Sequence, residues 1–359
     1  MNPTEAVLIA GASGVVGHQL VRLVRQHYPD LPLLLGGRGL PALQQLAQDV
    51  GRAQAVQMDV QQPQPLKALR PRAVLALVND PLDYLLDDAL QAGVAYLDIT
   101  RWTARLKTAA ARVSAAPARA PVLLASGWMG GLASTLASLI ARDMQWVERV
   151  DLSVLYALKD QSGPDSVEYM ARLATPFEVL EQGRLITVKP YSDPRRVQFS
   201  GGHAARVYRF DTPDQLTLPG TTGASSVSAR IAFDDRLTMP LLIGLGRSGL
   251  WRLIDGPRFK GLRHALLHNP GDGAPHEVLI QVQGLDGRGQ AQVRRLGLCD
   301  PQGQTHLTAL GALLQLERLL GLDGAPPAAA GLHYPETARA LPALLNRLGE
   351  QGVRVDEGA

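Results

Sequence analysis

The sequence of 359 residues contains a single cysteine, Cys299. One cysteine excludes an internal disulfide and is typical of proteins in a reducing cytosol. No stretch approaches the roughly 20 consecutive apolar residues that a membrane-spanning helix needs. The N-terminus also lacks the basic region and apolar core of a secretory signal. We therefore expect a cytoplasmic protein with no membrane partner.

An excess of charge of one sign is also missing. The formal net charge is +3, and the arginines are scattered with no aromatic residues interleaved among them. This pattern argues against a nucleic-acid partner and is compatible with a small anionic ligand. With 46% apolar and 19% charged residues, the composition is that of a folded protein long enough for two domains.

What the sequence does contain is a glycine turn at its start. The apolar run Val7–Ala10 leads into Gly11, Gly14 and Gly17, and an apolar helical pattern follows. The first glycine permits a sharp turn, the second lets a pyrophosphate approach the backbone, and the third lets the helix pack closely on the strand. The start of that helix attracts phosphate groups. The turn between strand and helix predicts a dinucleotide site.

Strand and helix patterns then alternate as far as Met144, with short connections. This alternation predicts a doubly wound α/β fold with a parallel sheet, a Rossmann-type domain over residues 1–145. Strand-like runs dominate afterwards and predict a second domain with a mixed or antiparallel sheet over residues 146–305, for substrate binding or dimerisation. Helices in 306–359 are expected to return to the first domain.

The end of the second predicted strand indicates which dinucleotide binds. NAD sites usually place an acid there, to bond the ribose hydroxyls. This sequence has Gly36, Gly37 and Arg38 instead, and a guanidinium suits a 2′-phosphate. We predict NADP(H), with a solvated surface arginine as the alternative. Asp59, at the end of the third strand, is expected near the adenine, or alternatively in a turn or helix cap.

Further polar residues follow the fourth and fifth strands. Asn79 is expected to face the nicotinamide ribose and Asp80 to cap the next helix, although Asp80 is also a candidate carboxylate for the reaction. Asp98 is a candidate proton donor or orienting group, with a helix cap as the alternative. Arg101 is a candidate for holding a substrate carboxylate.

A second glycine-rich turn, Ser126–Gly131, precedes a predicted helix from Leu132 to Met144. Two roles are open for this turn: it approaches the nicotinamide ring or the substrate, or it serves only as the exit from the nucleotide domain.

The predicted catalytic residues are Asp98, Arg101 and Asp80. The predicted cofactor-binding residues are Gly11, Ser13, Gly14, Val15, Val16, Gly37, Arg38, Asp59, Val60, Val78 and Asn79. The predicted substrate-binding residues are Trp102, Trp128, Met129 and His203. No metal site is predicted.

Several catalytic motifs are absent. None of the eight tyrosines has a lysine four residues later, the pair that catalytic short-chain dehydrogenases use. No H-E-x-x-H, C-x-x-C or serine nucleophile elbow is present.

The sequence resembles the saccharopine dehydrogenase-like family. The residues that carry the resemblance are Gly11–Gly17, Gly36–Arg38, Met58–Val60, Ala73–Pro81, Ala92–Ile99, the turn before Leu132 and, more loosely, His333–Glu336. The resemblance implies a nucleotide-binding domain with an inserted α+β domain, NAD(P) dependence and a homodimer. Met129 and Gly130 replace the proline that the family's second turn usually carries, so the resemblance does not fix the substrate.

The function expected from these features is hydride transfer from NADPH to an imine or a related unsaturated carbon of a small, anionic or imine-forming substrate. The alternatives are an accessory enoyl or carbonyl reductase and a non-catalytic NADP(H)-binding sensor.

Overall fold

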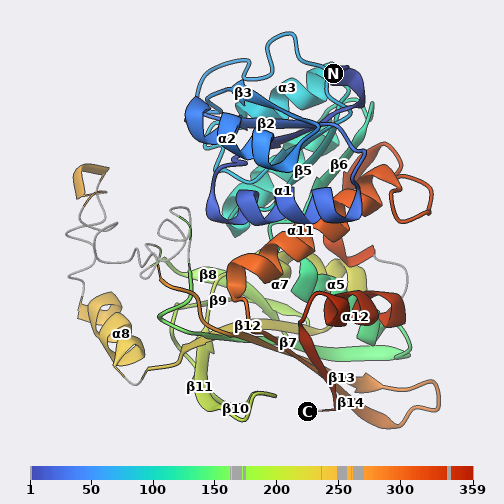
Figure 1. Ribbon diagram of the computed structural model, residues 1–359. Coiled ribbons are helices and arrows are strands. Elements are labelled where there is room, and N and C mark those ends of the chain that lie inside the picture. Colours follow the sequence, from blue (N-terminus) through green and yellow to red (C-terminus); the bar gives the residue numbers. More distant parts are fainter. Residues whose placement is uncertain are drawn as a thin grey trace. The chain divides into compact units, whose positions relative to one another are not determined.

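The computed structural model describes residues 2–161, 163, 172, 175–235, 237–248, 257–259, 261, 271–337 and 341–358. The chain forms two compact units (Figure 1). The first unit comprises Met1–Leu132 and Thr308–Pro335, and the second comprises Ala133–Leu307 and Glu336–Ala359. This grouping differs from the predicted one, because only part of the C-terminal segment 306–359 belongs to the first unit.

The first unit is built on a seven-stranded parallel sheet with the strand order β15-β6-β5-β4-β1-β2-β3. Its strands are β1 (Val7–Ala10), β2 (Leu33–Gly37), β3 (Ala53–Gln57), β4 (Ala73–Ala76), β5 (Ala95–Asp98), β6 (Pro121–Leu124) and β15 (Gly331–His333). Its helices are η1 (Pro3–Glu5), α1 (Val15–His27), α2 (Leu40–Val50), α3 (Tyr84–Ala92) and α4 (Thr103–Ala115). The predicted doubly wound α/β fold is confirmed, and β15 adds a strand that the sequence did not predict.

The central strands of this sheet are buried because helices cover both faces. All four residues of β1 and of β4 are buried. Helix α1 packs its apolar stripe, which includes Leu20, Val21 and Val24, toward the core. Continuous apolar strands of this kind are typical of parallel sheets covered on both sides.

The second unit contains a seven-stranded mixed sheet with the order β10-β11-β12-β7-β13-β14-β16, in which only β12 and β7 pair in parallel. Its strands are β7 (Trp146–Tyr156), β10 (Arg195–Gln198), β11 (Ala204–Arg209), β12 (Ser226–Phe233), β13 (His276–Leu285), β14 (Ala291–Asp300) and β16 (Arg354–Glu357). A separate hairpin consists of β8 (Phe177–Glu181) and β9 (Arg184–Val188).

Helices α5 (Leu132–Ala141), α7 (Asp214–Thr222) and α12 (Leu341–Glu350) lie on one side of the mixed sheet (Figure 1). The remaining helices are α8 (Thr238–Ser248), η2 (Pro257–Phe259), η3 (Pro335–Thr337) and α11 (Gln304–Leu320), which begins in the second unit and continues in the first. The sequence pattern of residues 167–180 predicts a helix, and this prediction is wrong at its end, since β8 starts at Phe177; residues 167–171, 173 and 174 lie outside the described residues.

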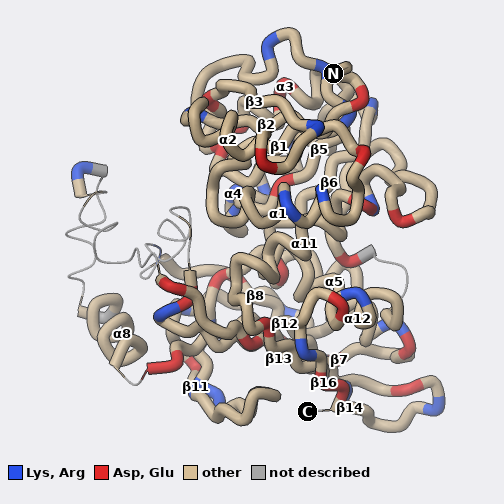
Figure 2. The backbone as a smooth tube through the Cα atoms, in the orientation of Figure 1, with Lys and Arg blue, Asp and Glu red and all other residues tan. Residues whose placement is uncertain are grey.

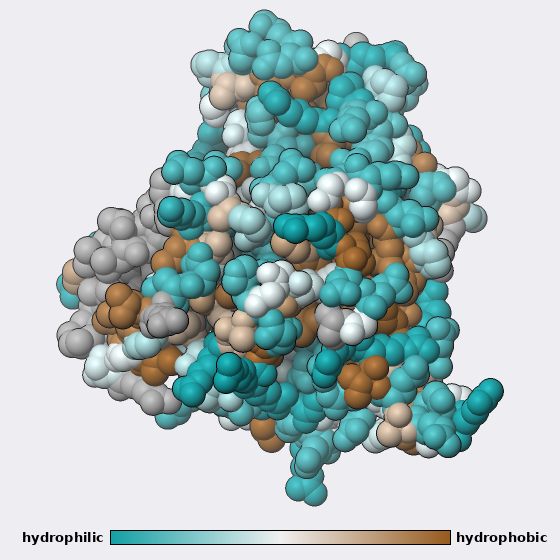
Figure 3. Space-filling model, turned by 60° about the horizontal axis from the view of Figure 1, so that its bottom comes forward, coloured by the Kyte–Doolittle hydropathy of each residue, from teal (hydrophilic) through white to brown (hydrophobic). Residues whose placement is uncertain are grey.

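Charges of both signs are interspersed along both units, as Figure 2 shows. On the face that Figure 3 shows, hydrophilic residues cover much of the surface, and hydrophobic residues gather in several places between them. Within the described residues, no helix combines the length and apolarity needed to cross a bilayer.

Candidate cofactor and active site

Parallel pairing brings most of the predicted site residues to one edge of the first unit. Ala10, at the end of β1, pairs with Gly36 of β2 and with Ala76 of β4, and Ala76 pairs with Asp98 of β5. The segments that follow these strands therefore emerge side by side. In doubly wound folds this carboxyl edge is where ligands bind.

The first glycine turn has the backbone that the spacing predicts. Gly11 adopts φ +90°, a left-handed conformation that favours glycine, and its N–H donates to the Gly36 carbonyl at 2.8 Å. A Cβ on Gly17 would lie 2.8 Å from Ala12 Cα and closer still to the Gly11 carbonyl. Gly17 therefore allows α1 to pack directly on the turn.

The start of α1 is open. Gly14 occupies the N-cap position, where no side chain caps the helix, and both Ser13 and Gly14 are exposed. A Cβ on Gly14 would meet only the Gly11 carbonyl, at 3.2 Å. Val15 and Val16 are half-buried in the first turn of the helix. The uncapped N–H groups and the positive end of this 13-residue helix suit an anion such as a diphosphate.

The end of β2 lies beside this turn. A Cβ on Gly37 would lie 3.8 Å from the Ser13 hydroxyl, so Ser13, Gly37 and the adjacent Arg38 gather at one point. Arg38 is exposed, and among the described residues its guanidinium has no hydrogen-bond or ion-pair partner. Its carbonyl accepts from Gln57 Nε2 at 3.5 Å. A guanidinium without an acid beside it is free to pair with a ligand phosphate.

Asp59 forms a local turn. Its carboxylate accepts the Gln61 N–H at 3.0 Å and its carbonyl accepts the Gln62 N–H at 3.1 Å. The structure thus gives Asp59 the turn role that was the alternative in the sequence analysis. Val60, which follows it, is buried, and contact of either residue with adenine stays a prediction.

Asn79 and Asp80 differ in burial and in the hydrogen bonds that their side chains make. Asp80 is buried, and its carboxylate accepts the N–H groups of Tyr84 at 3.1 Å and Leu85 at 2.9 Å, which is the expected capping of α3. Burial raises the pKa of Asp80, although the Leu85 N–H and Arg101 oppose the shift. Asn79 is half-buried, and its Oδ1 accepts from Arg105 at 2.7 Å. Val78 lies against Gly11, with its Cβ 3.2 Å from where a Gly11 Cβ would be.

Asp98 and Arg101 form a buried ion pair. Arg101 Nε donates to Asp98 Oδ2 at 2.5 Å, and Ser126 Oγ donates to Asp98 Oδ1 at 2.6 Å. Arg101 also pairs with Asp83, and the side chains of Asp98 and Arg101 are 1% and 2% exposed. Both carboxylate oxygens of Asp98 and the guanidinium of Arg101 are hydrogen-bonded within the protein. This geometry favours a role in holding the neighbouring chain segments in place over proton transfer or substrate binding.

The charges around Arg101 stabilise its cationic form. Burial by itself would lower the pKa of Arg101, but the charges of Asp98 and Asp83 outweigh burial and raise it above its ordinary value. Burial also raises the pKa of the Tyr96 phenol, and the Asp98 charge adds to that shift. Tyr96 is therefore neutral at physiological pH and lies 3.5 Å from Arg101 Nη2 as a hydrogen-bond partner.

Asp83 and Arg105, which no sequence motif indicated, also belong to this network. Asp83 precedes α3 with φ +60°, and its Oδ1 accepts from Arg101 and from Arg105 Nη2, the latter at 2.5 Å. The guanidinium of Arg105 also lies 5.5 Å from the centre of the half-buried Trp102 ring. The available signal was the position of both arginines at the start of α4, since Arg101 lies just before the N-cap residue Trp102 and Arg105 lies in the first turn of the helix.

The second glycine turn packs against α11. A Cβ on Gly130 would lie 3.0 Å from the Thr308 carbonyl and 3.1 Å from the Ala312 nitrogen. Met129 is buried with φ +53°, while Trp128 is half-buried. This close approach explains the glycines by packing against α11, a role that the sequence did not indicate. A substrate contact of Trp128 or Met129 stays a prediction.

His203 belongs to the second unit, unlike the other predicted site residues. It is exposed, and its Nδ1 lies 2.6 Å from Glu277 Oε1, while Glu277 Oε2 accepts the Gly201 N–H at 2.8 Å. Glu277 therefore fixes the turn between β10 and β11 to β13. Among the described residues, no three His, Cys, Asp or Glu side chains are grouped to hold a metal ion.

No protein-family model matches the chain, and no curated protein matches its sequence significantly. Solved structures do match. Saccharopine dehydrogenase (L-Glu forming) from Saccharomyces cerevisiae has a TM-score of 0.68 and 15% identity, over 99% of this chain and 100% of that one. A putative myo-inositol dehydrogenase from Sinorhizobium meliloti 1021 is less similar, with a TM-score of 0.44, 14% identity, and coverage of 99% and 100%.

The similarity to the yeast structure confirms, at the level of the fold, the resemblance carried by the glycine turn and the strand ends. The chain is structurally similar to saccharopine dehydrogenase along nearly its whole length, well beyond the segments that carry the resemblance in the sequence.

Proposed function

We propose that the chain is an NADP(H)-dependent oxidoreductase that reduces an imine. The observation that carries the cofactor assignment is the site formed by Ser13, Gly37 and Arg38, which offers a free guanidinium and no carboxylate at the end of β2. A ribose with free hydroxyls would find no acid on that strand end, whereas a 2′-phosphate finds a cation.

The residues present fit a dinucleotide. The open backbone at Gly14 and the uncapped start of α1 would hold the diphosphate, and Gly11, Val15 and Val16 shape the same turn. Ser13, Gly37 and Arg38 would hold the phosphorylated ribose, with Asp59 and Val60 beyond them. Val78 and Asn79 follow β4 and would face the nicotinamide ribose. NADPH, when bound, supplies the hydride, and the protein supplies orientation and electrostatics.

The charge balance beyond β4 and β5 supports an imine over a carbonyl or enoyl group. The carboxylates of Asp80, Asp83 and Asp98 outnumber the guanidiniums of Arg101 and Arg105 by one. A net negative charge stabilises a cationic iminium and disfavours the oxyanion that develops when a carbonyl is reduced. The network would act as a group, with Asp98 and Arg101 positioning the segment that carries Trp102.

The cofactor assignment is tested by titrating NADPH and NADH into the wild-type protein and two variants. Arg38→Gln is expected to raise the Kd for NADPH about tenfold or more and to leave that for NADH nearly unchanged. Arg119→Gln is the matched control. Arg119 is exposed, and its Nη1 donates to the Gln91 carbonyl. It lies just before the start of β6, a strand near the edge of the sheet that is opposite to β2. Tighter binding of NADH than of NADPH by the wild type would refute the assignment.

The reaction is tested by following NADPH absorbance with panels of an amino acid plus a 2-oxo acid. Turnover with such pairs, and none with isolated enoyl or carbonyl compounds, is the expected result. The alternative of a non-catalytic sensor is supported by the engagement of Asp98 and Arg101 with internal partners. Tight NADPH binding without turnover of any substrate would favour it and exclude the imine reductase.

A further inference from the structure

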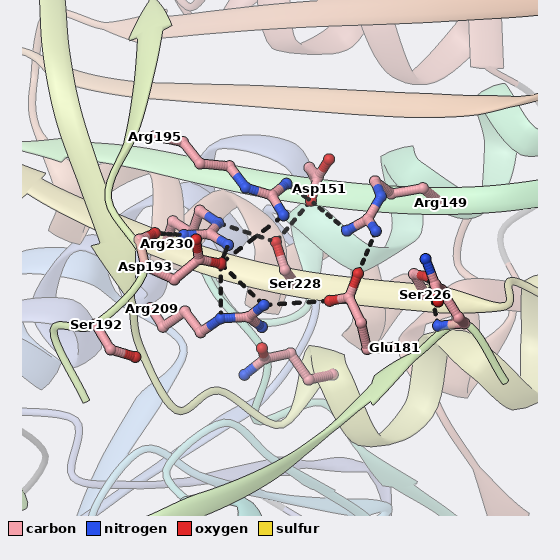
Figure 4. Close-up of polar contacts among 12 residues, drawn as sticks. Arg149, Asp151, Glu181, Ser192, Asp193, Arg195, Arg209, Ser226, Ser228 and Arg230 are labelled. Carbon is pink, nitrogen blue, oxygen red and sulfur yellow. Dashed lines mark hydrogen bonds and ion pairs between the residues drawn. The ribbon is translucent and has the colours of Figure 1, made fainter. Parts of the chain in front are cut away.

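One face of the mixed sheet in the second unit carries a cluster of arginines and acids (Figure 4). We call it the arginine cluster. Its members are Arg149, Arg195, Arg209 and Arg230, together with Asp151, Glu181 and Asp193. None of these residues belongs to the site described above, which lies in the other unit.

Strand register gathers the cluster. Ser228 of β12 pairs with Asp151 of β7, and Arg230 pairs with Arg209 of β11. Since alternate residues of a strand share a face, Arg149 lies on the same face as Asp151, and Ser228 on the same face as Arg230. Glu181 comes from the end of β8, and Asp193 from the loop before β10. Segments far apart in sequence thus place seven charged groups together.

Each carboxylate in the cluster is shared between two or more guanidiniums. A single oxygen, Asp193 Oδ2, lies 2.5 Å from Arg230 Nη2, 2.9 Å from Arg209 Nη2 and 3.9 Å from Arg195 Nη2. Glu181 is shared between Arg149 and Arg209, which therefore flank one carboxylate. Asp151 accepts from Ser228 Oγ at 2.6 Å and from Arg195 at 3.3 Å.

Two guanidinium nitrogens of the cluster lack hydrogen bonds within the described part of the chain. Arg209 Nη1 and Arg149 Nη1 are buried, and no described residue accepts a hydrogen bond from either; Asp151 Oδ1 lies 3.8 Å from Arg149 Nη1. The Arg209 side chain is 7% exposed. Buried donors of charged groups are costly to leave unpaired, by about 1–3 kcal/mol or more, so two in one cluster indicate a missing acceptor.

The cluster also has an excess of positive charge. Four guanidiniums face three carboxylates. Burial would raise the pKa of Asp193 and of Glu181, but hydrogen bonds and charges of the arginines outweigh burial and lower both, so these acids are ionised. The next acid along β7, Glu148, is exposed, and water therefore screens its charge.

We propose that the arginine cluster binds the carboxylate group of a small organic monoanion, which would complete its hydrogen bonds at Arg149 and Arg209. Planar guanidiniums match a carboxylate in geometry, and one added negative charge balances the cluster. A phosphate dianion would overcompensate it beside three existing carboxylates. Entry is possible on the side of Asp193 and Arg195, whose side chains are 46% and 35% exposed.

The test is titration of the full-length protein with sodium acetate at constant ionic strength, without any nucleotide, followed by calorimetry and by thermal unfolding. Saturable binding with a rise in Tm is expected, and sodium phosphate should bind at least tenfold more weakly than acetate. Arg209→Gln should weaken acetate binding at least tenfold. Arg149→Gln should weaken acetate binding to the same extent. Circular dichroism shows whether each variant folds, and the second variant decides the test if the first does not fold.

Arg196→Gln is the matched control. Arg196 is an exposed arginine that follows Arg195 on β10. Its substitution by glutamine removes one positive charge, as Arg209→Gln does, but leaves the residues of the arginine cluster in place. Binding within twofold of wild type is expected. The proposal is overturned if acetate does not bind saturably, if phosphate binds more tightly, or if Arg196→Gln weakens binding as much as Arg209→Gln. Because no nucleotide is present, failure here would leave the proposed oxidoreductase activity untouched.

Discussion

Asp160 Oδ2 lies 3.6 Å from His276 Nδ1, and both side chains are completely buried in the second unit. Asp160 also accepts the Gln304 N–H at 2.8 Å at the start of α11. Burial raises the pKa of Asp160 to about 6, against the hydrogen bonds from Gln304 and Gln161, and burial lowers the pKa of His276 to about 3. At a pH between about 3 and 6, Asp160 is protonated and His276 is not, so both buried groups are neutral.

Removing one member of this pair should expose the titration of the other. In Asp160→Asn, His276 keeps a folded pKa below its unfolded value, so the unfolded state binds the extra proton. The free energy of unfolding should then fall as the pH drops below about 6.5, the ordinary value for histidine. Urea unfolding between pH 4 and 8 measures this slope.

In His276→Gln the sign is opposite. Asp160 keeps a folded pKa above its unfolded value of 3.8, so the folded state binds the proton. Stability should fall as the pH rises from about 4 to 6 and then level off. In the wild type the two slopes oppose each other over this range, and a nearly flat profile is expected there. Parallel pH profiles for the two variants would contradict the neutral pair.

The buried pair of Asp98 and Arg101 should be sensitive to loss of one partner. Arg101→Met leaves Asp98 buried without its cation, and we expect a loss of about 3–5 kcal/mol in the free energy of unfolding. The double variant Asp98→Asn with Arg101→Met should lose less than the sum of the single variants, because no isolated charge remains.

The control for this cycle is an exposed ion pair in the same unit. Arg112 lies 2.6 Å from Asp87, with both side chains more than a third exposed. Arg112→Met should therefore change stability by no more than about 1 kcal/mol. Chemical denaturation of the four variants measures both effects, and additive losses for Asp98 and Arg101 would show that the two are not coupled.

Arg105 should act on the cofactor through Asn79. Its Nη1 holds Asn79 Oδ1 at 2.7 Å, which directs the amide nitrogen of Asn79 away from Arg105. If Asn79 bonds the nicotinamide ribose, Arg105→Lys should raise the KM for NADPH severalfold with a smaller change in kcat, because a lysine keeps the charge but loses the planar fork. An unchanged KM in both Arg105→Lys and Asn79→Ala would exclude this role.

Gly17 should tolerate no side chain. A methyl group would overlap the Gly11 carbonyl and Ala12, so Gly17→Ala should destabilise the protein by about 1–3 kcal/mol and weaken NADPH binding by displacing α1 from the turn. Gly349→Ala in α12 is the comparison, since a Cβ there meets nothing within 4 Å. That variant should gain about 0.5–1 kcal/mol, because alanine favours helix. A stable Gly17→Ala protein with full affinity would refute the packing argument.

The sequence by itself determined the first unit in considerable detail. Apolar runs of strand length, the glycine turn and the short connections predict the parallel sheet, because each of these signals is local. The same holds for Gly93, because a glycine directly after a helical pattern predicts the end of a helix, and Gly93 ends α3 with φ +64°. Arg38 could be placed at the strand edge for the same reason, since its position depends only on where β2 ends.

The partners of the charged residues were decided by tertiary structure alone. Asp98 and Arg101 were predicted as catalytic groups from their position, yet their bonds to Ser126 and Asp83 depend on how β5, β6 and α3 pack. In the second unit, Arg149, Arg209 and Arg230 meet only because β7, β12 and β11 pair in one register. Local patterns fix where a strand ends, but strand pairing over long sequence separations decides which charges become neighbours once they leave water.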